Sequence, residues 1–313
     1  MSDRARRDAF NLRWWRIVAT IAAGLFWAAA VATATEPAGD AASHTSLNPV
    51  YAKLTAESEP LRLRPAKFDD SQSADEQRAD LAKAGGDRYS PDTLLRPTAV
   101  APHVLTMERE PLEKLDATLQ RVRIVFTLRG DLDSLASDSF LDSMMAVGGE
   151  DGAGEVDEAA SRRLTAEELL AAGIDAESLA DTESYRLVRG ELFSRVRFSG
   201  VAHSRWSRTD RSILMAVRFD DSFAGQPGLR PSWERLERDE AGELSVVETG
   251  EFAGGGAFIK ITRWRDDPAM LVVEAELMLV EPKAWFGGSN LIGSKLPPAI
   301  QSQVRTIRRA ARK

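Results

Sequence analysis

Residues able to carry out catalysis are few in this sequence and lie far apart along it. The histidines are His44, His103 and His203, and none has a second histidine at the spacing that a metal site needs. The sequence has no Gly-x-Ser-x-Gly motif and no cysteine, which argues against a nucleophile elbow and excludes a thiolate metal site. We therefore expect no metal, no cofactor and no enzymatic activity. Hydrolysis remains a minor alternative that would require a serine or a carboxylate paired with His203 in a deep cleft.

Two further motifs have simpler explanations than chemistry. The run Gly254-Gly255-Gly256 precedes an expected strand rather than a helix N-terminus, so it favours a bulge or a tight crossing over a phosphate cradle. The adjacent acidic pairs, such as Asp220-Asp221 and Asp266-Asp267, tend to direct their side chains apart and are typical of loops.

Tryptophan and arginine side chains in the second half of the chain are better prospects for binding. Aromatic planes can stack on sugar rings, and arginines can hold carboxylates through two hydrogen bonds. Such a set could hold an anionic glycan, and the residues that we select for it are Arg205, Trp206, Arg208, Arg263, Trp264 and Trp285. The alternative is that at least half of the tryptophans in this region are core residues.

Composition excludes several classes of protein. The 313 residues include 41 Lys and Arg against 48 Asp and Glu, a formal net charge of −7, which argues against nucleic acid as a main partner. The absence of cysteine means that stability must come from a packed core rather than from disulfides.

The N-terminus has the features of a secretory signal peptide. Five arginines lie within the first 16 residues, an apolar run follows from Ile17 to Thr35, and small residues stand at Ala32 and Ala34. We expect cleavage after Ala34 and a periplasmic or otherwise exported location. The alternative is an uncleaved membrane anchor, because the apolar run is almost long enough to span a bilayer.

The sequence is expected to have three parts: a signal peptide at 1–34, a disordered or extended tether at 35–102, and one domain at 103–313. The tether has Tyr51, Phe68 and Tyr89 as its aromatic residues, too few for a core of its own. Partial docking of this stretch on the domain is the alternative. A glycine-rich acidic segment at 148–160 is expected to be a mobile loop.

The domain is expected to be α+β, an antiparallel sheet meander flanked by a few helices. Helices are expected at 108–120, at 131–147, after Thr165, where Glu168 completes a capping box, and at 297–312. Period-two alternation predicts strands, and the expected strands are 121–128, 195–206, 212–219, 243–247, 257–264 and 270–280. In the last strand Glu274 and Glu276 are expected to face water, opposite the core. The last helix is expected to be amphipathic, with its arginines on a solvated face.

Two segments resemble CsiV-like proteins. They are the unit LTMEREPLEKLDATLQRVRIVFTL at 105–128 and the pair of strands GGAFIKITRWRDDPAMLVVEAELMLVEP at 255–282. The resemblance implies an exported envelope protein associated with peptidoglycan binding and with cell shape or septation. It transfers no functional residues to this chain, which lacks the His-rich C-terminal segment of that family.

The sequence thus predicts a non-enzymatic protein of the cell envelope that binds cell-wall glycan, such as peptidoglycan, or another envelope protein. The alternative is a carrier of an apolar or lipid ligand in a cavity between the sheet and the C-terminal helix. Membrane contact is expected only through an uncleaved N-terminal segment or through the basic C-terminal helix.

Overall fold

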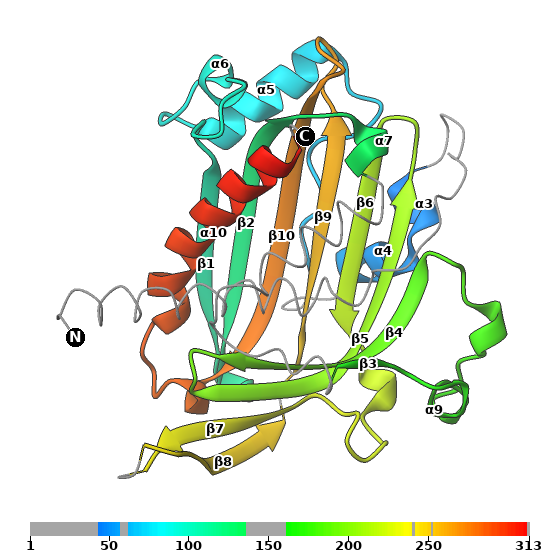
Figure 1. Ribbon diagram of the computed structural model, residues 1–313, viewed down its shortest axis with the longest axis vertical. Helices are drawn as coiled ribbons and strands as arrows, with labels where there is room; N and C mark the ends of the chain where they lie inside the picture. Colours follow the sequence, from blue (N-terminus) through cyan, green and yellow to red (C-terminus); the bar gives the residue numbers. More distant parts are fainter. Residues whose placement is uncertain (1–42, 57–61, 136–160, 240–241, 252, 312–313) are drawn as a thin grey trace.

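The computed structural model describes residues 43–56, 62–135, 161–239, 242–251 and 253–311 (Figure 1). Within these ranges the chain forms one large antiparallel sheet and several helices, one of them near the C-terminus, which confirms the expected α+β class. The expected signal peptide at 1–34 and the expected acidic loop at 148–160 lie outside the described residues.

The sheet has ten strands, all paired antiparallel. Its main path runs β1-β2-β10-β9-β6-β5-β4-β3, and β7 pairs with β5 and with β8. The strands are β1 (Val104–Leu112), β2 (Ala117–Arg129), β3 (Arg162–Arg163), β4 (Glu183–Leu192), β5 (Val196–Arg208), β6 (Ser212–Phe219), β7 (Ser232–Arg238), β8 (Leu244–Glu251), β9 (Gly255–Arg263) and β10 (Met270–Pro282).

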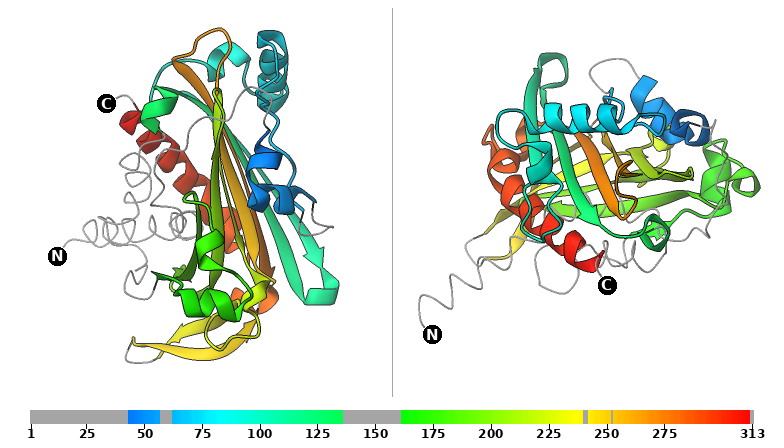
Figure 2. Two further views of the ribbon diagram at one scale, coloured as in Figure 1. Left: turned by 90° about the vertical axis from the view of Figure 1, so that its right-hand side faces the viewer. Right: turned by 90° about the horizontal axis from the view of Figure 1, so that it is seen from above.

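Helices cover both faces of this sheet. They are α3 (His44–Leu47), α4 (Pro49–Ala56), α5 (Ala74–Gly85), α6 (Pro91–Leu94), α7 (Leu132–Leu135), α9 (Ala166–Ala171) and α10 (Leu291–Ala310). Figure 2 shows the sheet edge-on, with α10 on one side and α3, α4 and α5 on the other. We call the face under α10 the inner face and the opposite face the outer face.

The outer face is covered by the stretch that the sequence suggested was a tether. Residues 43–56 and 62–102 form α3 to α6 and pack on the strands. Val50, Tyr51 and Leu54 are at most 5% exposed and contact apolar residues of β2, β6, β9 and β10. The expectation of a disordered or extended segment is thus wrong for these residues. A layer that buries only one side needs few large apolar residues, so its composition resembles that of a tether.

The glycine run before β9 makes room for this layer. A Cβ atom at Gly256 would lie 2.4 Å from Leu54 Cδ2, and one at Gly255 would lie 2.5 Å from the Met278 carbonyl oxygen. Gly254 has a φ of +87°, which favours glycine. The run therefore allows a close crossing, as the sequence suggested, and does not form a phosphate cradle.

The outer face also buries charge. Glu274 and Glu276 are each 1% exposed, contrary to the expectation that they face water. Arg123 of β2 forms ion pairs with both carboxylates, and Arg64 lies 3.0 Å from Glu276 Oε1. The alternation along β10 was predicted correctly, but the second face is covered by the N-terminal layer, so its charged side chains must be paired.

The segment 104–129 is a β-hairpin, not the expected helix at 108–120 followed by a strand. β1 and β2 pair from Val104↔Val125 to Leu112↔Ala117 around a turn in which Asp116 has a φ of 45°. Leu112, Leu115 and Leu119 have helical spacing, but Leu115 is 52% exposed at the turn, whereas Leu119 is fully buried in the sheet. The spacing alone could not separate these two structures.

Other elements agree with the sequence prediction. The hairpins β5–β6 and β9–β10 occur within a few residues of the expected bounds, and Thr165 with Glu168 forms the expected capping box. The C-terminal helix begins six residues before its expected start and contains Pro297 and Pro298 in its interior. Its Arg308 is 3% exposed rather than solvated, and donates to the carbonyl oxygens of residues 101, 102 and 127.

We expect Leu54→Ala to lower the free energy of unfolding by about 2–5 kcal/mol, because it opens a cavity under a fully buried side chain. Urea unfolding followed by circular dichroism measures this change. Leu170→Ala is the control, since Leu170 is 71% exposed and its loss should change stability by less than about 0.5 kcal/mol. Equal, negligible effects of the two variants would contradict the packing of α4 on the sheet.

We also expect Arg123→Met to destabilise the protein by about 3–5 kcal/mol, because it leaves two buried carboxylates without their shared cation. The control is Arg129→Met, which removes an exposed ion pair with Asp267 and should cost less than about 1 kcal/mol. A thermal unfolding series of both variants tests the difference, and similar losses of stability would argue against the buried pairing.

Candidate functional site

A continuous row of apolar side chains crosses the inner face. It contains one residue from each of six neighbouring strands, and the strand registers place each residue directly opposite the next. These residues are Leu105, Ile124, Ala275, Ile259, Met215 and Trp206. With about 4.8 Å between strands, the row spans about 24 Å. We call it the central row. Apart from Met215, its members are only partly buried.

A second row runs beside the central row and changes character at one end. It contains Met107, Val122, Leu277, Ala257 and Val217, then continues to Ser204 and Ser184. The two serine hydroxyls lie 2.9 Å apart and are both buried. The two rows are therefore apolar from β1 to β6, and the second row ends in hydroxyl groups at β5 and β4.

Two groups of side chains lie at the ends of this face, an exposed ionic group at one end and a buried aromatic group at the other. Toward α7, Asp133 pairs with Arg208 and lies 3.1 Å from an Arg263 nitrogen atom. At the opposite end Trp285 and Phe286 pack edge to face, and Phe286 meets Phe193 in the same way. The helix α10 packs on the face near β2 through Ile300 and Val304, among others. The central row lies within this frame.

Trp206 brings a polar atom to the end of the central row. Its indole Nε1 is buried and has no hydrogen-bond partner in the part of the chain that the structure describes. A buried donor without a partner is costly. At the β5 end of the row this N–H is therefore placed to donate a hydrogen bond to a ligand oxygen atom.

The six residues expected to bind a glycan do not form one surface. Trp206, Arg208 and Arg263 belong to the inner face, whereas Arg205 and Trp264 belong to the outer face. Trp264 is 3% and Trp285 1% exposed. For these two tryptophans, as for Trp233, the core alternative is correct. The arginines on either side of Trp206 in β5 are paired with acidic residues, Arg205 with Glu183 and Arg208 with Asp133.

His44 lies in a buried polar cluster on the outer face that the sequence did not reveal. Its ring nitrogens lie 2.7 Å from Ser207 Oγ and 2.6 Å from Ser212 Oγ. The Ser212 hydroxyl donates its hydrogen bond to Asp70. His44 Nε2 must therefore be protonated and donate a hydrogen bond to Ser212 Oγ. Burial, followed by the nearby charge of Lys260, lowers the pKa of His44 to about 4.

This cluster contains the residue types of a catalytic triad without its order. In a triad the imidazole bridges the serine and the carboxylate, whereas here Ser212 bridges His44 and Asp70. Ser212 is also fully buried. The cluster fastens the N-terminal layer to β5 and β6.

His203 lies between two carboxylates, also on the outer face. Its Nε2 is 2.6 Å from Glu183 Oε1 and its Nδ1 is 3.5 Å from Asp220 Oδ2, while the Tyr185 ring stacks on it at 4.0 Å. Burial opposes the charge, but the contacts with Asp220 and Glu183 outweigh it and raise the pKa of His203. A raised pKa favours the imidazolium form, which has no lone pair with which to act as a general base.

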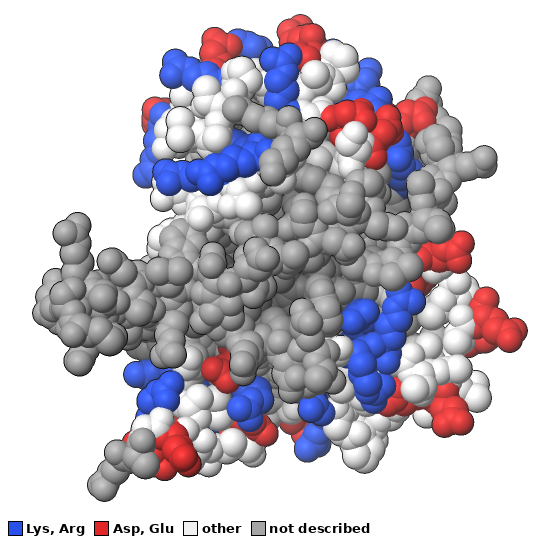
Figure 3. All heavy atoms as spheres, in the orientation of Figure 1, with Lys and Arg blue, Asp and Glu red and all other residues white. Residues whose placement is uncertain are grey.

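The described ranges contain neither a cluster of metal ligands nor a membrane-spanning helix. No group of three or more His, Asp or Glu residues there is arranged to hold a metal ion. No helix within those ranges has the length and apolar character required to cross a bilayer. Arg305 and Arg309 of α10 are exposed, and Figure 3 shows basic side chains gathered near the C-terminal end of that helix.

No family model and no curated protein sequence matches this chain. Solved structures that align with it include the STAR-related lipid transfer protein of Xanthomonas axonopodis, at 13% identity over 67% of this chain and 94% of that chain, with a TM-score of 0.38. Human STARD10 aligns at 11% identity over 77% of this chain and 84% of that chain, with a TM-score of 0.34. Alignments this distant do not assign the chain to a family.

We expect His203 to titrate at a higher pH than His44 and His103 in NMR spectra of the histidine ring protons. His203 should titrate above the usual 6.5 and His44 near 4, while burial, followed by the charges of Arg308 and Arg305, lowers the pKa of His103. His203 therefore stabilises the fold below pH 6.5, an effect lost as the pH rises through its raised pKa. The contribution of His44 has the opposite sign: it is present above pH 6.5 and is lost as the pH falls toward 4.

The variants His203→Gln and His44→Gln assign the two signals. If His44 titrates near 6.5, the buried cluster with Ser207 and Ser212 is not formed in solution.

Proposed function

We propose that this protein is a non-enzymatic binding protein or carrier for an apolar or lipid ligand, held between the inner face and α10. The observation that supports this most is the central row, which crosses six strands and in which every apolar side chain except Met215 stays partly exposed. Apolar surface left in water costs about 25 cal/mol per Å². A ligand that covers the row recovers this cost.

The surroundings of the row also fit such a ligand. Ligand sites are mostly apolar and contain a few polar groups that fix orientation. Here the polar groups are the unpartnered indole N–H of Trp206 and the hydroxyls of Ser184 and Ser204. The arginines near the row are paired with Asp133, which favours an apolar body over a highly charged polymer such as an anionic glycan.

The location belongs to the same proposal. An arginine-rich start followed by an apolar run supports export to the cell envelope, where a carrier would transfer or store an apolar molecule between membranes or envelope proteins.

Binding of the fluorescent apolar probe N-phenyl-1-naphthylamine tests the proposal. We expect saturable binding by the purified protein and at least a tenfold loss in Ala275→Phe, because the added ring fills the centre of the central row. Ile259→Gln should weaken binding in the same direction by placing an amide in an apolar contact.

The control is Val246→Phe, which adds the same ring type to exposed β8, where Val246 is 48% exposed. It should bind the probe like the unaltered protein, and thermal unfolding should show that all variants fold. Absence of saturable binding by the unaltered protein, or equal binding by Ala275→Phe, would overturn the proposal.

A further inference from the structure

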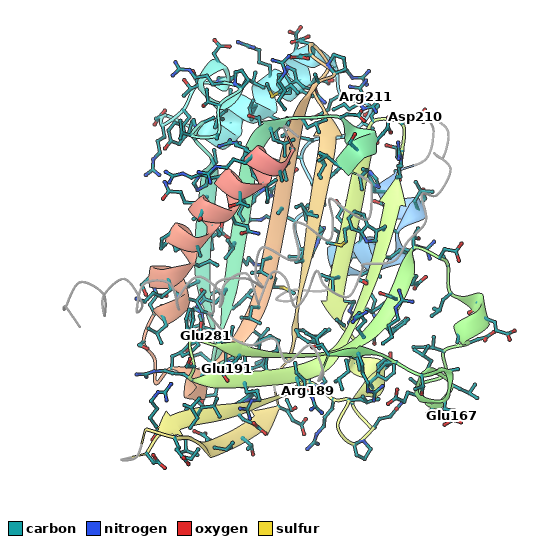
Figure 4. All side chains as sticks on the ribbon, viewed as in Figure 1. Glu167, Arg189, Glu191, Asp210, Arg211 and Glu281 are labelled. Carbon is teal, nitrogen blue, oxygen red and sulfur yellow. The ribbon has the colours of Figure 1, made fainter. Side chains whose placement is uncertain are left out.

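The inner face has a buried polar pair at the end opposite α7. Along β2 the residues on this face are Ile124, Val122 and Gln120, and along β10 they are Leu277, Leu279 and Glu281. Gln120 is 2% exposed and Glu281 is 4% exposed. In Figure 4 Glu281 lies at the lower end of the sheet, away from the turn that holds Asp210 and Arg211. Gln120 lies two residues beyond Val122 along β2, opposite Leu279, and Glu281 lies two residues beyond Leu279 along β10.

The hydrogen bonds of this pair are incomplete. Gln120 Nε2 donates to Glu281 Oε2, but Gln120 Oε1 is buried and has no partner among the described residues. An amide oxygen can only accept hydrogen bonds. What is missing is therefore a donor, and a buried acceptor without one costs stability.

The charge near this oxygen determines which donor fits. The Glu281 carboxyl adjoins Gln120, and burial raises its pKa. The cation that acts on Glu281 is Arg109 of β1, whose side chain is exposed. An anionic group brought here would lose its water and meet a buried carboxyl group rather than a buried cation. An uncharged hydroxyl would lose little and would supply the missing donor.

We propose that the ligand is an uncharged amphiphile with a hydroxyl group, which donates to Gln120 Oε1 while its apolar body lies along the two rows of the inner face. This inference rests on the proposed function and specifies its ligand class. The protein is accordingly expected to bind long-chain alcohols and related neutral lipids more tightly than fatty acids and other anionic lipids of the same length.

Displacement of N-phenyl-1-naphthylamine by dodecanol and by dodecanoate tests the inference. We expect dodecanol to displace the probe at a lower concentration than dodecanoate. The double variant Gln120→Leu/Glu281→Met should weaken dodecanol binding by about two- to tenfold, the loss of one hydrogen bond. Replacing both partners avoids leaving one of them buried and unpaired. Glu281→Gln, which removes the carboxyl group and keeps the Gln120 oxygen, should strengthen dodecanoate binding and leave dodecanol binding similar.

Gln301→Leu is the matched control, because Gln301 is exposed on α10, and it should leave both affinities unchanged. If dodecanol and dodecanoate bind equally well, and the double variant changes both alike, the inference is wrong while the proposed function stands. If no probe or amphiphile binds the unaltered protein, the proposed function fails and this inference fails with it. Retained preference for dodecanol in the folded double variant would also overturn the role of Gln120.

Discussion

The sheet of this protein carries apolar side chains on both faces, and the rest of the structure depends on that constraint. Strands such as β6, whose eight residues are all buried, cannot leave either face in water. Segments from opposite ends of the chain meet this requirement, α3 to α6 on the outer face and α10 on the inner face. Both coverings pack apolar side chains on the sheet, and they differ in their polar contacts: the outer one joins several buried charged groups to the strands, whereas α10 is joined to β2 by the hydrogen bond of Arg308 to the carbonyl oxygen of Thr127.

That difference separates stability from binding. On the outer face Arg123 joins two buried glutamates, and Ser212 joins His44 to Asp70, so each polar group requires one geometry. On the inner face α10 contacts the sheet mainly near β2, and the central row continues past it to Trp206. Apolar contacts are not directional, so the contacts of the inner face restrict geometry less than the buried polar contacts of the outer layer do.

Local patterns predicted six of the ten strands, missed β1, β3, β4 and β7, and predicted the layers poorly. Alternation identified both strands of the β9–β10 and β5–β6 hairpins, and the Thr165 capping box was read directly from two residues. Alternation could not reveal that Glu274 and Glu276 are buried, because that depends on Arg64 and Arg123, which lie far away in sequence. The same holds for the site: Ile259 and Leu277 were visible as apolar positions, but only the register of six strands shows that they form rows. Gln120 was missed because the leucine spacing of 112–119 suggested a helix.

The outer layer also has a consequence for biosynthesis. His44 pairs with serines 163 and 168 positions later, and Arg64 pairs with a glutamate 212 positions later. The ribosome therefore makes this layer long before the strands that receive it exist, and such distant pairings slow folding. Residues 43–56 and 62–102 therefore cannot complete their contacts with the sheet until β10 has been synthesised.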